Sequence, residues 1–414
     1  MKFMETLLAQ HPQWKYVVQI CQQLHNQGYE AVLAGGCVRD ALLGKLAKDI
    51  DIATSATPEQ IEKIFPRVIM VGKSFGVCRV VMADDQDPIE LATFREESDY
   101  KDGRHPEHVA YSDMKKDSAR RDFTVNAMFY DIGQKHVLDY VGGLTDLQNK
   151  VLRTVGVPEE RFAEDSLRLL RAARFAAQLE FTVEEKTLQA VQKAAGQLTR
   201  VSSERRHDEI NKAFAIEKPF LFFKKLRQMN LQTVLFSTLD WNEADLQRFF
   251  KNPRPPHWGW AALVCLESSK KSAEAIRIVS TFKLSKDTLS FIHLCLELNV
   301  FLKAGAEKTE AVTLAPFVSL MQKAQIGDVV AFLRKCLAAT EGFRQELDAF
   351  ASWDSLTSKY AAAGLPVAMV AGKDLLDAGV KPGPELGQLL QKAFLLQLQN
   401  PNFTRDEIIS KILL

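Results

Sequence analysis

The sequence predicts an α+β N-terminal domain, with a small mixed sheet and helices, followed by an all-α remainder. Up to about residue 150, short apolar stretches with the period of a strand alternate with helical stretches. After Glu159, nearly every segment has the period of a helix. A length of 414 residues also exceeds one ordinary domain. The main domain boundary is therefore expected near residue 150.

The expected elements of the first part follow one another closely. An amphipathic helix, a short apolar strand and a helical stretch are predicted over residues 14–28, 30–34 and 38–43. Thr57 is expected to cap a helix that runs to residue 65, because Pro58 suits the first helical position. Two more strands are predicted over residues 77–82 and 88–94.

Asp49 and Asp51 form the first candidate site. In residues 49–53 carboxylate and apolar residues alternate, which predicts a strand with both aspartates on one face. Two carboxylates this close need a cation between them if they are buried, and Mg²⁺ prefers such oxygen ligands. A solvated edge strand or a salt bridge to Lys48 is the alternative, and the pair taken alone favours it.

Two further features suit a bound nucleotide. At a turn between strand and helix, Gly36 lets the backbone approach a ligand, and free N–H groups there attract phosphate. Arg39 can grip a triphosphate, and a tight turn in which it pairs with Asp40 is an equal alternative. Glu90, between apolar neighbours on a predicted strand, either adds a third carboxylate or faces solvent.

The overall composition excludes several classes of protein. Lys plus Arg number 53 against 52 Asp plus Glu, so any surface that binds nucleic acid must be local. The six cysteines include no C-x-x-C pair, which argues against zinc and disulfides and favours a reducing cytoplasm. Residues 1–10 lack a basic n-region and a full apolar h-region, so secretion is not expected. No run of eighteen apolar residues occurs, so a membrane span is not expected.

Residues 34–59, 120–127, 138–147 and 161–175 contain four motifs, and their order and sequence resemble the motifs of class II CCA-adding enzymes and bacterial poly(A) polymerases. Residues 34–59, with Gly-Gly-Cys-Val-Arg-Asp and Asp-Ile-Asp, are similar to the family's first motif. Residues 120–127, Arg-Arg-Asp-Phe-Thr-Val-Asn-Ala, resemble its R-R-D-F-T-x-N-A, and residues 138–147 resemble its Gly-Gly hinge. Residues 161–175 are similar to its nucleotide-selecting helix. Residues 200–209 resemble the final neck motif, for which a structural role is expected.

The resemblance implies four parts of the chain. They are a nucleotidyltransferase head over residues 1–150, a helical neck over 151–215, a helical body over 216–300 and a helical tail over 301–414 that supports RNA. Beyond about residue 216 no motif is recognised, and which residues contact RNA there is left open.

The resemblance also implies roles for the head residues. Mg²⁺ would be held by Asp49 and Asp51, and Glu90 would activate the RNA 3′ hydroxyl or complete the metal site. The residues implied to contact the triphosphate, or the phosphate or sugar of the nucleotide, are Gly36, Arg39, Arg121 and Asp122.

Asp165 and Arg168 are expected on neighbouring faces of one helix, three residues apart. A carboxylate accepts from the exocyclic amino group of cytosine or adenine and repels the carbonyl oxygens of uracil and guanine, while an arginine can donate to the ring nitrogen. The resemblance assigns this pair the selection of C and A; an ordinary helix salt bridge is the alternative. Arg171 and Arg174 match arginines that lie against the nucleotide, with a solvated cationic face as the alternative.

The implied activity is the addition of C and A to the tRNA 3′ end, from CTP and ATP, with release of pyrophosphate. The polar stretch over residues 95–106 is expected to be a mobile loop. A flexible loop at this place in the family is associated with the switch from C to A addition, which argues against an enzyme that adds only C. The alternatives are a poly(A) polymerase or A-adding enzyme that uses ATP only, and a non-catalytic RNA-binding protein.

Overall fold

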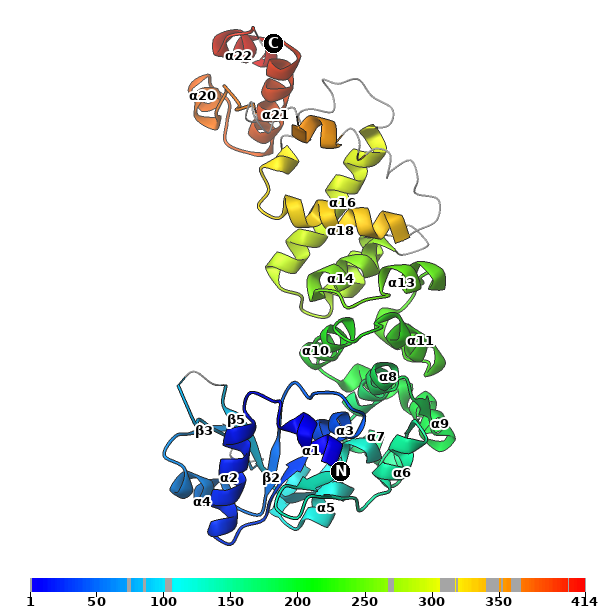
Figure 1. Ribbon diagram of the computed structural model, residues 1–414. Helices are drawn as coiled ribbons and strands as arrows, with labels where there is room; N and C mark the ends of the chain where they lie inside the picture. The colour runs from blue at the N-terminus through cyan, green and yellow to red at the C-terminus, as the bar shows by residue number, and fades with distance from the viewer. Residues whose placement is uncertain are drawn as a thin grey trace. The chain divides into compact units, whose positions relative to one another are not determined.

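The chain forms two compact units, Met1–Ser237 and Thr238–Leu414. The computed structural model, drawn in Figure 1, describes residues 2–72, 76–84, 87–100, 106–266, 272–305, 317, 319–339, 350, 353–358, 366–400 and 402–413. The finer division at residues 150, 215 and 300 stays a prediction.

A mixed seven-stranded sheet is the centre of the first unit, with the order β3-β4-β5-β2-β1-β8-β9. Neighbouring strands pair antiparallel except β2 and β5, which pair parallel. The strands are β1 (Ala31–Ala34), β2 (Ile52–Thr54), β3 (Val68–Gly72), β4 (Val77–Val80), β5 (Ile89–Thr93), β8 (Phe129–Asp131) and β9 (His136–Leu138).

Short helices accompany this sheet. Thr57 caps α4 as predicted: its hydroxyl accepts from the Gln60 N–H, the Gln60 side chain accepts from the Thr57 N–H, and Pro58 begins the helix. Val32, Ala53 and Phe129 are part of a buried apolar cluster on the sheet. The helices are α1 (Lys2–Leu8), α2 (Trp14–Asn26), α3 (Gly36–Leu42), α4 (Pro58–Ile64), α5 (Met114–Ala119) and the 3₁₀ turn η2 (Thr124–Asn126).

The strand expected over residues 49–53 begins only at Ile52. The Ala34 N–H still donates to the Asp51 carbonyl at 3.0 Å, but β1 ends at Ala34, where the chain turns into α3. β1 therefore offers Asp49 no residue with which to pair. The alternation persists even so, because Ile50 is buried between two exposed aspartates.

The loop expected over residues 95–106 is also corrected. Its two ends belong to an antiparallel hairpin of β6 (Arg95–Tyr100) and β7 (Pro106–Tyr111), and residues 101–105 lie outside the described part of the chain. Each strand supplies the other's backbone hydrogen bonds, so the hairpin forms without the apolar alternation on which strand prediction depends.

The rest of the first unit is mainly helical. The helix expected from Arg161 to Phe175 is broken, because α7 ends at Glu164 and α8 begins at Leu167. Asp165 between them is extended (φ −144°, ψ 102°), and its carboxylate accepts from the Leu167 N–H at 3.0 Å. The elements are α6 (Gly143–Gln148), β10 (Val151–Leu152), α7 (Pro158–Glu164), α8 (Leu167–Leu179), β11 (Thr182–Val183), α9 (Glu185–Ala194), η3 (Ala195–Arg200), α10 (Ser203–Phe214), α11 (Phe220–Gln228) and α12 (Gln232–Phe236).

The second unit is built from helices around aromatic side chains. The Phe332 ring makes edge contacts with Trp258 and Phe291, at centroid distances of 5.7 and 5.6 Å. Within the described residues, no helix is long and apolar enough to cross a membrane. Its helices are α13 (Glu243–Phe249), α14 (Pro256–Cys265), α15 (Ser272–Ser280), α16 (Lys286–Gly305), α18 (Ile326–Ala339), α20 (Gly372–Asp377), α21 (Pro384–Gln399) and α22 (Arg405–Leu413).

Candidate active site

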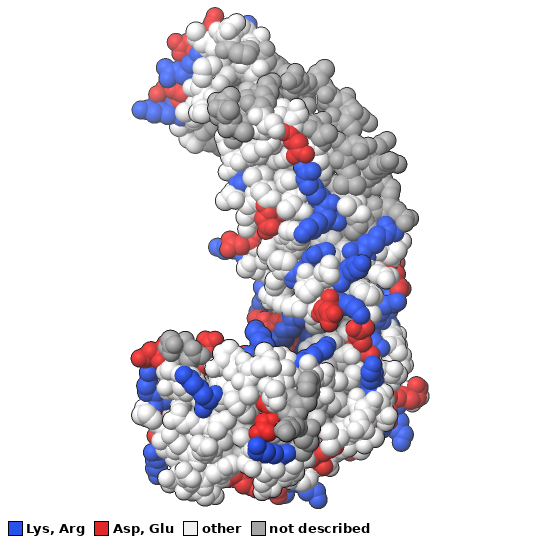
Figure 2. Space-filling view, in the orientation of Figure 1, with Lys and Arg blue, Asp and Glu red and all other residues white. Residues whose placement is uncertain are grey.

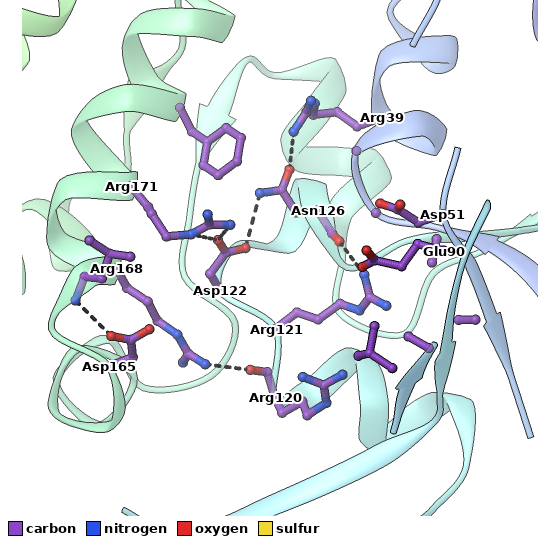
Figure 3. Close-up of a pocket in the computed structure, with 18 of the residues that line it drawn as sticks. Arg39, Asp51, Glu90, Arg120, Arg121, Asp122, Asn126, Asp165, Arg168 and Arg171 are labelled. Carbon is purple, nitrogen blue, oxygen red and sulfur yellow. Dashed lines mark hydrogen bonds and ion pairs between the residues drawn. The ribbon is translucent and has the colours of Figure 1, made fainter. Parts of the chain in front are cut away.

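A cavity of about 630 Å³ lies within the first unit and gathers most of the predicted site residues. Asp51 and Glu90 lie on one side of it, and Asp165 and Arg168 on the opposite side (Figure 3). Its charged lining consists of Arg39, Arg95, Arg120, Arg121, Arg168, Arg171, Arg174, Arg205, Asp51, Glu90, Asp122 and Asp165. Eight arginines against four carboxylates favour a polyanionic ligand. Positive charge is thus concentrated here, whereas both signs of charge occur along the face shown in Figure 2.

Ten of the eleven predicted site residues line this cavity, and Asp49 is the one that does not. The roles of these residues stay predictions.

The parallel pairing of β2 with β5 brings two carboxylates together. Ile52 is the register partner of Leu91, so the preceding residues, Asp51 and Glu90, are also side by side. Strands lie about 4.8 Å apart, and successive side chains point to opposite faces. Because Ile52 and Leu91 are both 0% exposed, Asp51 and Glu90 face the cavity.

The electrostatics at this acidic pair suit a cation. Asp51 is open to the cavity, but protein atoms surround it on its other sides, and this burial raises the pKa of Asp51 to about 6. The negative charges of Glu90 and Asp49 add to the rise in the pKa, and Arg121 opposes it. A cation bound there would relieve the repulsion, and the oxygen-only donor set fits Mg²⁺. Among the described residues, however, no three His, Cys, Asp or Glu side chains are arranged as a complete metal cage.

Arg39 is buried in the lining of the cavity, and hydrogen bonds hold its guanidinium group. Its Nε donates to Asp40 at 2.8 Å, and its Nη1 donates to Asn126 Oδ1 at 2.5 Å. The pairing with Asp40 that was the alternative to phosphate binding is thus present, yet Arg39 still lines the cavity beside Gly36. Gly35 before it has φ 74°, a conformation that favours glycine, and this turn starts α3 at Gly36.

A chain of hydrogen bonds continues from Asn126 to the helical wall of the cavity, which α8 and α10 form. Asn126 donates to Asp122 at 3.2 Å, and Arg171 donates to the other Asp122 oxygen at 2.9 and 2.7 Å. Arg171 also lies 3.5 Å from Glu209, which accepts from Arg174 at 2.6 Å. Arg174 is only 7% exposed, so the alternative of a solvated cationic face is wrong for it. These paired arginines present fixed positive charge to the cavity.

Asp117 holds the two arginines that begin the second motif. One of its oxygens accepts from Arg120 at 2.6 Å, and the other accepts from Arg121 at 3.0 and 3.1 Å. Burial would raise the pKa of Asp117, but the two guanidinium groups outweigh it and hold the pKa below its ordinary value. At the base of the hairpin, Arg95 and Arg120 share Glu97.

The salt bridge between Asp165 and Arg168, which was the alternative to base selection, is not formed, because each side chain has other partners. Arg168 donates to Glu164 at 2.8 Å and to the Arg120 carbonyl at 3.0 Å. Asp165 accepts two hydrogen bonds from Arg205, at 3.0 and 2.8 Å. The reason is the helix break, since the geometry of two helical residues three apart does not apply to an extended Asp165.

The sequence prediction missed four residues that hold the charged side chains of the cavity in place. Asn126 stood inside the second motif, and its polar side chain beside Asp122 was a usable signal. Arg205 and Glu209 stood in a stretch interpreted as structural. Asp117 carried no signal, because its partners are evident only from the fold.

Comparison with known proteins places the chain in a family. A family model described as "Poly A polymerase head domain" matches residues 31–153, and one described as "Probable RNA and SrmB- binding site of polymerase A" matches residues 180–241. The CCA-adding enzyme of Lactiplantibacillus plantarum is 32% identical over 399 residues, which are 93% of this chain and 92% of that enzyme. The chain belongs to the CCA-adding enzyme family.

Two further relatives agree with this family assignment. The CCA-adding enzyme of Enterococcus faecalis is 45% identical over 194 residues, so the match spans 47% of this chain and about half (47%) of that enzyme. The crystal structure of the Bacillus stearothermophilus CCA-adding enzyme in complex with CTP has a TM-score of 0.72 and 28% identity, over 97% of each chain. The predicted fold class, an α+β head followed by helices, is confirmed.

Proposed function

We propose that this chain is a template-independent nucleotidyltransferase that adds C and A to the 3′ end of tRNA, with CTP and ATP as substrates and pyrophosphate as product. Its relationship to CCA-adding enzymes over almost the whole chain supports the proposal. The structural observation that carries it is the single cavity in which Asp51 and Glu90 lie opposite Asp165 and Arg168.

The two sides of the cavity suit the two ends of a nucleotide. We expect the triphosphate near Gly36, Arg39 and Arg121, where backbone N–H groups and guanidinium groups can neutralise its charge. The base would then lie toward Asp165 and Arg168. Since hydrogen bonds to Asn126, Asp117 and Asp122 hold these arginines, a nucleotide would meet donors that need little reorganisation.

We assign Asp49 and Asp51, with Glu90 next to Asp51, to a Mg²⁺ site. Bound Mg²⁺ supplies charge stabilisation for the attacking and leaving oxygens of phosphoryl transfer. Glu90 lies next to Asp51, so it either accepts the proton of the RNA 3′ hydroxyl or contributes to the metal site. Support comes from the oxygen-only donor set and from the raised pKa of Asp51.

We assign base selection to Asp165 and Arg168. A carboxylate at Asp165 accepts from the amino group of cytosine or adenine and repels the carbonyl oxygen of uracil or guanine. Glu164 and the Arg120 carbonyl fix the Arg168 guanidinium, which is only 11% exposed. Asp165→Ala should therefore increase incorporation of UTP and GTP, and an unchanged nucleotide preference would exclude this role.

One experiment separates the candidate activities. Transfer RNA ending before CCA, after C or after CC is offered with CTP and ATP separately, and the products are sequenced. Stepwise addition of C, C and A supports the proposal, an A tail on every substrate indicates a poly(A) polymerase, and A only after CC indicates an A-adding enzyme. The Asp49→Ala, Asp51→Ala double variant should lose at least about a thousandfold in rate, because a metal contributes several kcal/mol.

A cytoplasmic location belongs to the same proposal. It is supported by the six cysteines, all of which are free thiols, as expected in a reducing compartment.

A further inference from the structure

The partner of Asp165 in the cavity wall is Arg205, forty residues further along the chain. Arg205 Nη1 donates to Asp165 Oδ1 at 3.0 Å, and Nη2 donates to Oδ2 at 2.8 Å. Both side chains line the cavity and are about one-fifth exposed, at 23% and 20%. This two-point contact fixes the plane of the carboxylate, which a single contact would leave free to rotate.

The contacts leave few acceptor positions on Asp165. A carboxylate has about four lone-pair positions. Oδ1 uses two of them, for the Arg205 guanidinium and the Leu167 N–H, and Oδ2 uses one, for Arg205. A base in the cavity therefore meets Asp165 with one acceptor position open, on Oδ2.

Arg205 is itself held in place by its helix. It lies in the first turn of α10, four residues before Glu209, so both side chains share one face of that helix. Glu209 is buried and contacts Arg174 of α8 at 2.6 Å. One face of α10 therefore holds two side chains of the cavity wall. Glu209 holds Arg174, and Arg205 holds Asp165.

We propose that Arg205 is a positioning residue for base selection, which holds the Asp165 carboxylate so that Oδ2 presents a single acceptor to the incoming base. This inference rests on the proposed role of Asp165. Without Arg205, the carboxylate can turn away from a carbonyl oxygen, and the repulsion that rejects uracil and guanine weakens. Discrimination should then fall even though Asp165 is present.

The test compares kcat/KM for CTP and UTP on tRNA lacking CCA, together with the affinity of the enzyme for each nucleotide alone. For Arg205→Ala we expect the CTP-to-UTP ratio of kcat/KM to fall about tenfold, or about 1.4 kcal/mol at 25 °C. Arg205→Lys keeps the charge but only one contact, so its CTP-to-UTP ratio should lie between those of the wild type and Arg205→Ala. Arg206→Ala, the neighbour that does not line the cavity and donates to Ser203 at 3.3 Å, is the matched control and should keep the wild-type ratio.

A double variant shows whether Arg205 acts through Asp165. If it does, Asp165→Ala combined with Arg205→Ala discriminates as Asp165→Ala alone does. Additive losses would instead mean that Arg205 contacts the base directly, and the inference would be wrong. Thermal unfolding of each variant shows whether a loss of discrimination reflects misfolding. If Arg205→Ala is misfolded, the discrimination measured for Arg205→Lys decides whether the inference holds.

Failure of the inference differs from failure of the proposed function. If Asp165→Ala relaxes discrimination but folded Arg205→Ala and Arg205→Lys do not, Asp165 selects the base without help and the inference alone is overturned. If Asp165→Ala leaves discrimination unchanged, the selecting role of Asp165 is wrong and the inference falls with it.

Discussion

Arg171 donates two hydrogen bonds to one oxygen of Asp122, at 2.9 and 2.7 Å, and so joins the helical wall of the cavity to the motif that follows α5. Burial would raise the pKa of Asp122, but Arg171 and Arg168 outweigh it and hold the pKa below its ordinary value. Asp122 is thus an ionised anchor for Arg171 at neutral pH.

Asp122→Asn should lower kcat/KM for both CTP and ATP about 10- to 100-fold, because hydrogen bonds to charged groups contribute about 1.5–3 kcal/mol. The amide has one oxygen to replace two, and it brings an NH₂ group toward the donors of Arg171. Steady-state kinetics with each nucleotide measures the effect. Asp208→Asn, on an exposed position of α10, is the control, and equal kinetics for the two variants would exclude the anchoring role.

His11 should influence the requirement for Mg²⁺. Its Nδ1 accepts from the Gln13 N–H at 3.2 Å, so its Nε2 carries the proton and donates to the Lys48 carbonyl at 3.1 Å, one residue before Asp49. His11→Ala removes this contact and should raise the half-saturating Mg²⁺ concentration about three- to tenfold, because a neutral hydrogen bond contributes about 0.5–1.5 kcal/mol.

The comparison for His11 is His11→Gln, whose amide can donate to the Lys48 carbonyl and should restore part of the Mg²⁺ response. Initial rates over a range of Mg²⁺ concentrations, at saturating CTP, provide the measurement. A general loss of activity with an unchanged Mg²⁺ requirement would argue that His11 supports only the fold.

Glu209→Gln should destabilise the first unit by about 3–5 kcal/mol at pH 7, since it leaves the buried Arg174 without its charged partner. Burial would raise the pKa of Glu209, but Arg174 and Arg171 hold the pKa below its ordinary value. A lowered pKa in the folded state stabilises the fold above the unfolded pKa, and this stabilisation is lost as pH falls through the folded pKa.

Urea unfolding at several pH values therefore tests Glu209. The free energy of unfolding of the wild type should decline below about pH 4, and its difference from Glu209→Gln should shrink there. Glu217→Gln, at an exposed position, should match the wild type throughout. A difference that stays constant with pH would contradict the assigned pKa.

Two adjacent glycines should respond differently to alanine. A Cβ at Gly143 would lie 2.3 Å from the Thr124 carbonyl oxygen, so Gly143→Ala must displace the backbone between Asp122 and Asn126. It should cost at least about 3 kcal/mol of stability and reduce activity. Gly142 has φ 82°, but among the described residues nothing beyond its chain neighbours lies within 4 Å of an added Cβ, so Gly142→Ala should cost about 1–2 kcal/mol and keep activity. Thermal unfolding and CTP addition distinguish the two, and equal effects would contradict the close contact at Gly143.

Local patterns in the sequence predicted those elements of the head that depend only on neighbouring residues. The cap at Thr57 and the apolar strand ending at Ala34 follow from neighbouring residues alone. The paired strands β6 (Arg95–Tyr100) and β7 (Pro106–Tyr111) were not predicted because they are polar. The helix break at Asp165 was not predicted because the sequence has the period of a helix on both sides of it.

The unpredicted contacts of the candidate site join residues far apart in sequence. Asp165 and Arg205 are 40 residues apart, and Arg39 and Asn126 are 87 apart. Residue types and spacing in one sequence predict which side chains could bind a nucleotide. They do not identify which distant side chain holds each of them, because that depends on how the helices pack.

The register between β2 and β5 couples the acidic pair to the hydrophobic core. A slip of one residue in either strand would bury a carboxylate where Ile52 or Leu91 now packs, and would expose an aliphatic side chain to the cavity. The cost of burying an unpaired charge makes such a slip strongly unfavourable. Correct folding therefore also sets the geometry of the candidate site, because a molecule with a well-packed sheet necessarily has Asp51 and Glu90 side by side.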